Sequence, residues 1–225
     1  MKGERELVIT IDGPAGAGKS TAARLLAARL GYRLIDTGAM YRALALAVDR
    51  AALPPEDTPE LRRLLEGIQV ELRGEQVLLN GEDVSGRIRT PRISDLTSRL
   101  TMLEPIRAKV TPLQRAMAQA GGVVLEGRDT GTVVCPDADV KFYLDAGQEE
   151  RARRRQAELA ARGILVDLAV VHAEIGARDV QDKTRALAPL RKAPDAVEID
   201  TGGLTPGEVV ERMMREIERR CCTRS

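Results

Sequence analysis

Aromatic side chains are scarce in this sequence of 225 residues: they make up 2% of it, and tryptophan is absent. Proteins that bind single-stranded nucleic acid stack the bases on aromatic rings, so this composition argues against that class. The core must be built from leucine, valine, isoleucine and alanine. The 35 basic and 34 acidic residues nearly cancel, so no overall charge attracts nucleic acid or a membrane surface.

Cysteines and long apolar runs are also few. The three cysteines are Cys135 and the adjacent pair Cys221 and Cys222, a pattern that fits neither a disulfide framework nor a metal site and is typical of a reducing compartment. No segment approaches 18 consecutive apolar residues, and the first residues show no signal-peptide pattern. We therefore expect a cytoplasmic protein without a membrane segment. The single histidine, His172, has no visible partner and is expected to be structural.

A phosphate-binding loop is the clearest motif present. Residues 13–21 read GPAGAGKST, a complete G-x-x-x-x-G-K-[ST] pattern between an apolar, strand-like stretch and a helix-forming one. Glycines let successive backbone amides converge on an anion, Lys19 adds a charge toward the β- and γ-phosphates, and Ser20 can bind Mg²⁺. The residues predicted to contact the phosphates of ATP are Gly13, Gly16, Ala17, Gly18, Lys19, Ser20 and Thr21.

Strand-like and helix-like segments alternate along the chain. Strands are expected at residues 7–11, 32–35, 123–125, 140–144 and 196–200, with helices between them, including one at about 168–178. This alternation predicts an α/β domain with a doubly wound, five-stranded parallel sheet. Within it, residues 68–72 and 76–79 are separated by a tight-turn signal, which predicts an antiparallel insertion at about 63–91.

Polar residues follow several of these strands. Asp36 to Arg42 opens the next helix and is either a second anion site or an ordinary turn in which Asp36 or Thr37 caps the helix. Glu126 ends the strand at 123–125, where a carboxylate that holds Mg²⁺ through water is expected. Arg128 and Asp129 follow it in a glycine-rich loop, at the edge of the sheet where α/β proteins bind ligands.

Arginines cluster in the helix that begins near residue 148. Glu149 with Arg153 and Glu150 with Arg154 are spaced as surface ion pairs, so a solvated face is one interpretation. Arg151, Arg154 and Arg155 share one face, and the other interpretation is that they bind a triphosphate. Guanine-specific switches are excluded, because they read the base through an Asn-Lys-x-Asp segment, and the only asparagine here is Asn80, in the insertion.

Four motifs in order make the chain resemble the bacterial cytidylate kinases, which are nucleoside monophosphate kinases. They are residues 11–20 (IDGPAGAGKS), 36–42 (DTGAMYR), 127–134 (GRDTGTVV) and 185–190 (RALAPL), and the resemblance covers about residues 6–220. It implies a P-loop kinase that transfers the γ-phosphoryl group of ATP to CMP or dCMP with Mg²⁺ as cofactor. A monomer is expected, because no exposed apolar stripe indicates a partner surface.

The resemblance also implies roles for acceptor residues. The phosphate of the monophosphate would be held by Arg42, Arg128 and Arg185, the sugar by Asp182 and the base by Ser98, Arg107 and Asp129, with Thr37 and Tyr41 completing the set. Cytosine offers an amino donor at N4 and acceptors at N3 and O2. Asp129 and Arg107 suit that edge, whereas uracil would turn its O4 toward a carboxylate.

The family further implies a mobile lid at about 150–178, whose Arg151, Arg155 and Arg178 would close over ATP and act with Lys19 in catalysis. The single domain, 1–225, would then comprise a core of residues 1–62, 92–149 and 179–225, a monophosphate-binding insertion at 63–91, and this lid. One departure is Glu126, where many members of the family have aspartate. A P-loop kinase for another small acceptor, such as a different monophosphate or a sugar acid, and a non-catalytic nucleotide-binding protein are the alternatives.

Overall fold

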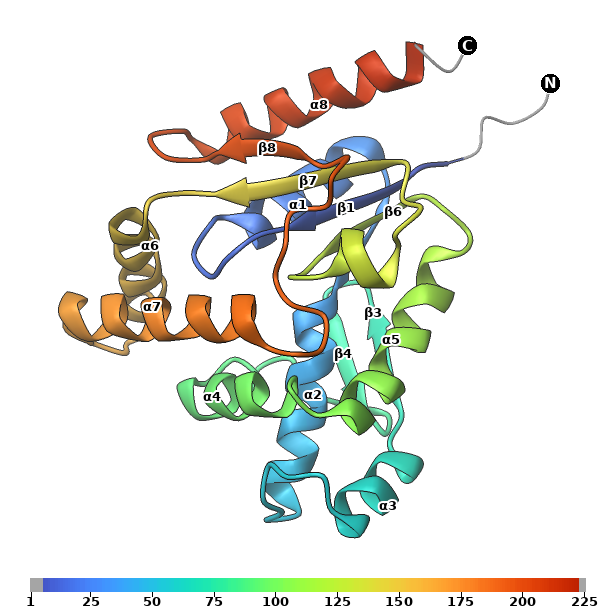
Figure 1. Ribbon diagram of the computed structural model, residues 1–225, viewed down its shortest axis with the longest axis vertical. Coiled ribbons are helices and arrows are strands. Elements are labelled where there is room, and N and C mark those ends of the chain that lie inside the picture. Colours follow the sequence, from blue (N-terminus) through green and yellow to red (C-terminus); the bar gives the residue numbers. More distant parts are fainter. Residues whose placement is uncertain (1–5, 223–225) are drawn as a thin grey trace. The chain divides into compact units, whose positions relative to one another are not determined.

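The computed structural model describes residues 6–222; residues 1–5 and 223–225, which belong to the predicted core, lie outside the described residues. The chain divides into two compact units (Figure 1). Unit 1 is Met1–Leu34 together with Gly121–Ser225, and unit 2 is Ile35–Ala120. Unit 2 is therefore wider than the antiparallel insertion expected at 63–91, and the division into core, insertion and lid stays a prediction.

Unit 1 is organised on a parallel sheet that has five strands within residues 6–222, in the order β2-β6-β1-β7-β8. β1 pairs in parallel with β6 on one side and β7 on the other, and β7 pairs in parallel with β8. This confirms the predicted five-stranded sheet. The strands are β1 (Val8–Asp12), β2 (Arg33–Asp36), β6 (Val123–Glu126), β7 (Val140–Asp145) and β8 (Val197–Asp200).

The core of unit 1 lies between one face of this sheet and two helices, α1 (Lys19–Leu30) and α8 (Pro206–Cys222). Ile9, Phe142 and Leu144 are fully or almost fully buried there, which explains why the strands read as continuous apolar runs. The two helices pack against each other, and α8 runs along the outside of β8 (Figure 1). Its start is a capping box between Thr205 and Glu208, as expected.

The position of β1 between β6 and β7 creates a topological switch point. The chain leaves β1 toward the phosphate loop and leaves β6 toward residues 127–134, so both loops start at the carboxyl edge of neighbouring strands. That edge is where open α/β sheets bind ligands. The second loop contains an unexpected π-helical turn, η1 (Thr130–Val134).

Two more helices complete unit 1. They are α6 (Gln148–Ala160) and α7 (Leu168–Thr184), which pack against each other. The predicted end of the second helix at Arg178 was wrong, because α7 continues to Thr184 and includes most of the charged run. Residues 178–184 contain no glycine or proline to stop it, and Asp179 and Asp182 are buried along it at a helical spacing of three.

Unit 2 is a separate cluster of helices around α2 (Thr37–Arg50) and a small antiparallel sheet. The sheet has three strands within the described residues, β3 (Val70–Arg73), β4 (Gln76–Leu79) and β5 (Glu82–Asp83), and it confirms the predicted antiparallel patch. Its core includes Met40, Leu44 and Ile106. The remaining helices are α3 (Pro59–Gly67), α4 (Pro91–Leu100) and α5 (Glu104–Ala118).

No helix between residues 6 and 222 has both the length and the apolar character needed to cross a bilayer.

Candidate active site

The phosphate loop joins β1 to α1 in unit 1. Gly13 has a φ of 147°, and a Cβ there would lie 1.9 Å from the carbonyl oxygen of Leu144, so only glycine fits. Gly18 has a φ of 83° and precedes α1 without any side-chain cap, which leaves the first amides of α1 for another acceptor. A helix start with these amides is suited to a phosphate.

Lys19 is buried in this loop, with its side chain turned back over it. Its Nζ donates a 2.6 Å hydrogen bond to the carbonyl oxygen of Pro14. Burial lowers the pKa of Lys19 well below its usual value, Arg128 and Arg178 lower it further, and Glu126 and Asp12 act in the opposite direction. A polyanion bound at the loop would favour the charged form of Lys19.

Ser20 and Glu126 meet across the switch point. The Ser20 hydroxyl donates a 2.7 Å hydrogen bond to Glu126 Oε2, which joins α1 to the end of β6. Among residues 6–222 no group of three or more His, Cys, Asp and Glu side chains could hold a metal ion. A hydroxyl and one carboxylate are nevertheless hard oxygen donors of the kind that bind Mg²⁺ together with substrate phosphates and water.

A buried ionic cluster lies in the same unit. Arg128 Nε is 3.0 Å from Asp182 Oδ2, Arg185 Nη1 is 3.4 Å from Asp182 Oδ1, and Arg185 Nη2 is 3.7 Å from Asp129 Oδ1. Burial by itself would raise the pKa of Asp182, but the charges of Arg128, Arg178 and Arg185 outweigh it and the pKa is lowered. Four residues predicted to bind the acceptor therefore lie in one cluster.

Arg151 is held inside unit 1 between α6, the phosphate loop and α7. Its Nη1 donates to the carbonyl oxygen of Ala15 at 3.1 Å, its Nε donates to the carbonyl oxygen of Ala146 at 2.9 Å, and its Nη2 lies 2.6 Å from Asp179 Oδ2. Only 5% of the residue is exposed. The structure thus brings Arg151 to the phosphate loop through a backbone carbonyl.

The other two predicted lid arginines differ from each other. The positive charge of Arg178 lowers the pKa of both Lys19 and Asp182. Arg155 instead pairs with Glu158 at 3.1 Å, one turn further along α6. The expected surface pairs Glu149–Arg153 and Glu150–Arg154 are both present.

Arg154 does not share a free face with Arg151. It donates to the hydroxyl and the carbonyl oxygen of Thr201 at 2.9 and 2.8 Å. The Thr201 hydroxyl in turn lies 3.2 Å from the carbonyl oxygen of Ala17 in the phosphate loop, and this makes Arg154 part of the loop's support. Side-chain spacing alone could not reveal this, because Thr201 lies 47 residues away.

In unit 2, Asp36 organises the start of α2. Its carboxylate accepts a hydrogen bond from the Ala39 amide at 2.8 Å, so the prediction that Asp36 or Thr37 caps this helix is confirmed for Asp36. Arg42 Nη2 lies 2.9 Å from the same carboxylate, and Arg89 Nη2 lies 3.2 Å from it. Thr37 is buried in the first turn. Arg89 was not among the predicted residues.

The predicted base-reading residues of unit 2 are linked through Thr101. The Arg107 Nε donates to the carbonyl oxygen of Thr101 at 2.7 Å. The Thr101 hydroxyl donates to the carbonyl oxygen of Ser98 at 2.9 Å. The Arg107 guanidinium also lies over the Tyr41 ring, 5.7 Å from its centroid, at cation–π distance. Unit 2 thus brings Tyr41 and Arg107 together, and Ser98 is linked to Arg107 through the backbone of the Ser98–Thr101 turn.

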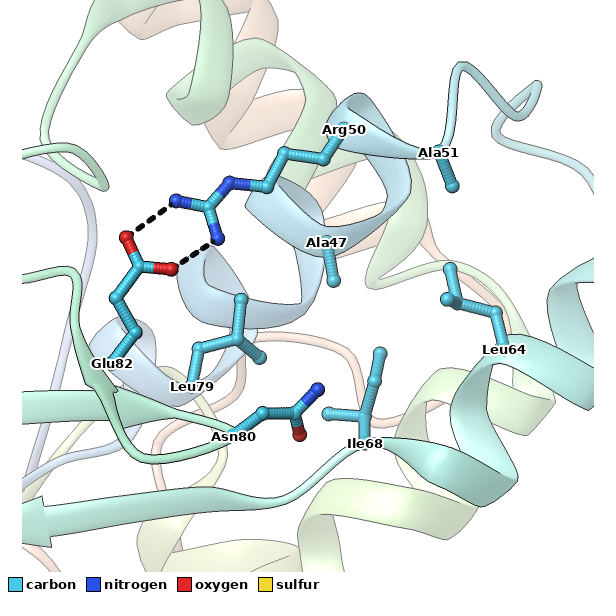
Figure 2. Close-up of a pocket in the computed structure, with 8 residues that line it drawn as sticks. All are labelled: Ala47, Arg50, Ala51, Leu64, Ile68, Leu79, Asn80 and Glu82. Atoms are coloured by element: carbon cyan, nitrogen blue, oxygen red, sulfur yellow. Dashed lines mark hydrogen bonds and ion pairs between the residues drawn. The ribbon is translucent and has the colours of Figure 1, made fainter.

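A separate pocket of about 340 Å³ opens elsewhere in unit 2. Figure 2 shows the paired side chains of Arg50 and Glu82 at one side, with the amide of Asn80 and several apolar side chains around the rest. None of the predicted site residues lines it. Its lining is Ala47, Arg50, Ala51, Leu64, Ile68, Leu79, Asn80 and Glu82.

Comparison with known proteins gives a family match over most of the chain. A protein-family model described as cytidylate kinase matches residues 9–219. A protein of Symbiobacterium thermophilum named cytidylate kinase is 50% identical over 222 residues, covering 96% of this chain and 98% of that protein. One of Geobacter sulfurreducens with the same name is 52% identical over 224 residues, covering 96% of each.

Solved structures give the same fold at lower identity. TT1252 from Thermus thermophilus is 20% identical, with a TM-score of 0.52 and coverage of 96% of this chain and 98% of that one. A gluconokinase from Sinorhizobium meliloti is 15% identical, with a TM-score of 0.50 and coverage of 96% and 94%. At these identities the likeness concerns the fold alone.

Proposed function

The chain belongs to the cytidylate kinase family, and from that premise we propose that it transfers the γ-phosphoryl group of ATP to CMP or dCMP, giving ADP and CDP or dCDP. One observation carries the proposal. A phosphate loop with a buried lysine and the Ser20–Glu126 contact lies in the same unit as a buried cluster of arginines and aspartates. A kinase needs both a donor site and a cationic acceptor site.

We assign the donor side to the phosphate loop. The amides at the start of α1 would bind the phosphate oxygens, and Lys19 would exchange its contact with the Pro14 carbonyl for the β- and γ-phosphates. Ser20, and Glu126 through water, would hold Mg²⁺, which when bound neutralises charge on those phosphates. Arg151 supports this loop through the Ala15 carbonyl.

Each unit by itself contains residues to which we assign a role in binding the acceptor. In unit 1, Arg128 and Arg185 would bind the phosphate of CMP, Asp182 the sugar hydroxyls and Asp129 the N4 amino group of cytosine. In unit 2, Arg42 would bind the phosphate, and Ser98 and Arg107 the base, with Thr37 and Tyr41 beside them. The ion pairs of these arginines with aspartates keep them ordered before the substrate arrives.

The reaction itself needs little from the protein beyond position and charge. An oxygen of the CMP phosphate attacks the γ-phosphorus in line with the bond to the departing ADP oxygen, and no covalent enzyme intermediate forms. No general base is required, because the attacking phosphate is already anionic. Lys19, Arg151, Arg155 and Arg178 would stabilise the negative charge that spreads in the transition state. Arg155 would first have to leave Glu158.

The residues of α6 and α7 that face the phosphate loop would act as a lid at about 150–178 and exclude water from the reaction. The core at 1–62, 92–149 and 179–225 and the monophosphate-binding insertion at 63–91 complete the proposed division. A monomer in the cytoplasm is the simplest assembly and location for an enzyme of this kind.

The test is an assay of ADP release from Mg·ATP with a panel of acceptors: CMP, dCMP, UMP, AMP, GMP and shikimate. Turnover with CMP and dCMP, weak with UMP and absent with the others, is expected. Turnover with another acceptor instead would mean that the substrate is a small molecule other than CMP. ATP consumption that does not depend on any acceptor, or no consumption at all, would favour a nucleotide-binding protein without kinase activity.

A further inference from the structure

Asp12 is a buried carboxylate at the end of β1, directly before Gly13 of the phosphate loop, and no part of the mechanism above uses it. Its Oδ1 accepts hydrogen bonds from the amide and the hydroxyl of Thr130, both at 2.8 Å. Its Oδ2 accepts one from the Gly131 amide at 2.7 Å. Both oxygens of Asp12 are therefore engaged by consecutive residues of the loop that follows β6.

These contacts hold the loop that carries Arg128 and Asp129. The three hydrogen bonds start at the residue immediately after Asp129, and Thr130 is fully buried. A Cβ on Gly131 would lie 2.8 Å from the Thr10 hydroxyl, so the backbone of the loop packs directly on β1. The following residues form the π-helical turn η1, a rare conformation that is common at functional sites.

A carboxylate is a costly choice for a purely structural contact in this position. Burial raises the pKa of Asp12 although Gly131 and Thr130 donate hydrogen bonds to it, and the charge of Asp129 raises it as well. Asparagine has nearly the same shape but only one acceptor oxygen, so its amino group would face an N–H donor. Only an ionised carboxylate satisfies all three donors at once.

We propose that Asp12 is a positioning residue for the acceptor: it fixes the loop of Arg128 and Asp129 against the phosphate loop, so that the acceptor-binding side chains are held in register with the donor. Asp12 acts through Thr130 and Gly131 and does not touch the nucleotide. The inference rests on the proposed function in one respect, namely that Arg128 and Asp129 bind the acceptor.

The test compares Thr130→Val, which removes the hydroxyl donor and keeps the shape, with Thr130→Ser, which keeps the donor. We expect Thr130→Val and Asp12→Asn to raise the KM for CMP and to lower the ratio of kcat/KM for CMP to that for UMP, each by about tenfold, because a buried partner loses its hydrogen bond. Thr130→Ser should stay within about threefold of the unsubstituted enzyme, since the hydroxyl is retained.

The control is Thr205→Val, which breaks the capping box of α8 and lowers stability without removing any hydrogen bond to Asp12. It should lower the melting temperature without changing the KM for CMP or the CMP-to-UMP ratio. If Thr130→Val and Asp12→Asn show the same KM and CMP-to-UMP ratio as Thr205→Val, Asp12 only stabilises the fold. That result would overturn the proposal. If Asp12→Asn does not fold, the Thr130 pair decides.

Hydrogen–deuterium exchange separates this inference from the proposed function. Exchange of the amides in residues 127–134 should be faster in Thr130→Val than in Thr130→Ser, whatever the enzyme phosphorylates. If the unsubstituted protein prefers another acceptor, the proposed function fails. The variants are then compared by their KM for that acceptor instead of their KM for CMP. Equal exchange in the two variants would overturn the positioning role even in an active CMP kinase.

Discussion

The Ser20 hydroxyl donates a hydrogen bond of 2.7 Å to Glu126, although the two residues are 106 positions apart in the chain. This contact brings the first turn of α1 to the carboxyl end of β6. Both side chains offer oxygen donors, and the charge of Glu126 acts on the buried Lys19. Ser20, and Glu126 through water, would hold Mg²⁺ there.

Glu126→Gln should weaken the binding of Mg²⁺ at this site. The amide has lost the negative charge, so we expect the half-saturating Mg²⁺ concentration to rise and kcat to fall, each by about 10- to 100-fold. The measurement is turnover of CMP across an Mg²⁺ titration at saturating ATP. Glu198→Gln is the control, because Glu198 is exposed and pairs with an exposed lysine, Lys192. An unchanged Mg²⁺ dependence in Glu126→Gln would remove Glu126 from the metal site.

Lys19→Ala and Arg185→Ala should each lower kcat by about 100-fold or more, which corresponds to about 3 kcal/mol of transition-state stabilisation. Both remove a buried positive charge proposed to stabilise the phosphates. Steady-state kinetics with ATP and CMP measure the effect. Lys192→Ala, which removes an exposed lysine, should keep full activity. Near-normal turnover in both test variants would contradict the proposed mechanism.

Asp129→Asn should change the choice of base. The carboxylate is proposed to accept from the N4 amino group of cytosine, whereas an amide can also donate to O4 of uracil, so the ratio of kcat/KM for CMP to that for UMP should fall by about tenfold or more. The measurement is that ratio in parallel assays. Asp137→Asn, at an exposed position, is the control. A ratio that stays at the unsubstituted value would mean that another residue reads the base.

The stabilising contribution of Asp182 should be lost in acid. Its pKa in the folded state lies below the ordinary 3.8, so the ionised form stabilises the fold. This contribution is fully present above the unfolded pKa and is lost as the pH falls through the lower folded value. Urea unfolding should show Asp182→Asn clearly less stable than the unsubstituted protein at pH 7, and the difference should shrink as the pH falls below the ordinary pKa of 3.8. A difference independent of pH would contradict the cause given for the shift.

Arg151→Lys should weaken ATP binding more than CMP binding. A lysine has no fork with which to reach the Ala15 carbonyl and Asp179 together. We expect the KM for ATP to rise by about tenfold and that for CMP by less than about threefold. Arg153→Lys, two residues along α6 and paired on the surface with Glu149, is the matched control. Equal effects on both substrates would place Arg151 in general support of the fold.

Local signals in the sequence were sufficient for the order of the elements and for the phosphate loop. These signals are the apolar strand runs, the Thr205–Glu208 capping box and the glycine spacing of the loop. Each involves only a few neighbouring residues, so it can be recognised in the sequence without knowledge of the fold. The antiparallel strands around Gly74 were predictable for the same reason. The end of α7 was not, because burial of Asp179 and Asp182 extends that helix.

Family membership and the residue types of the site therefore follow from the sequence by itself. Only the tertiary structure decided the partners of those residues: Thr130 and Gly131 for Asp12, the Ala15 carbonyl for Arg151, and Arg89 beside Arg42 on Asp36. The pairing of parallel strands brings residues together that lie more than 100 positions apart, such as Asp12 and Thr130. No local period or spacing encodes such a contact, because it depends on the register of the whole sheet.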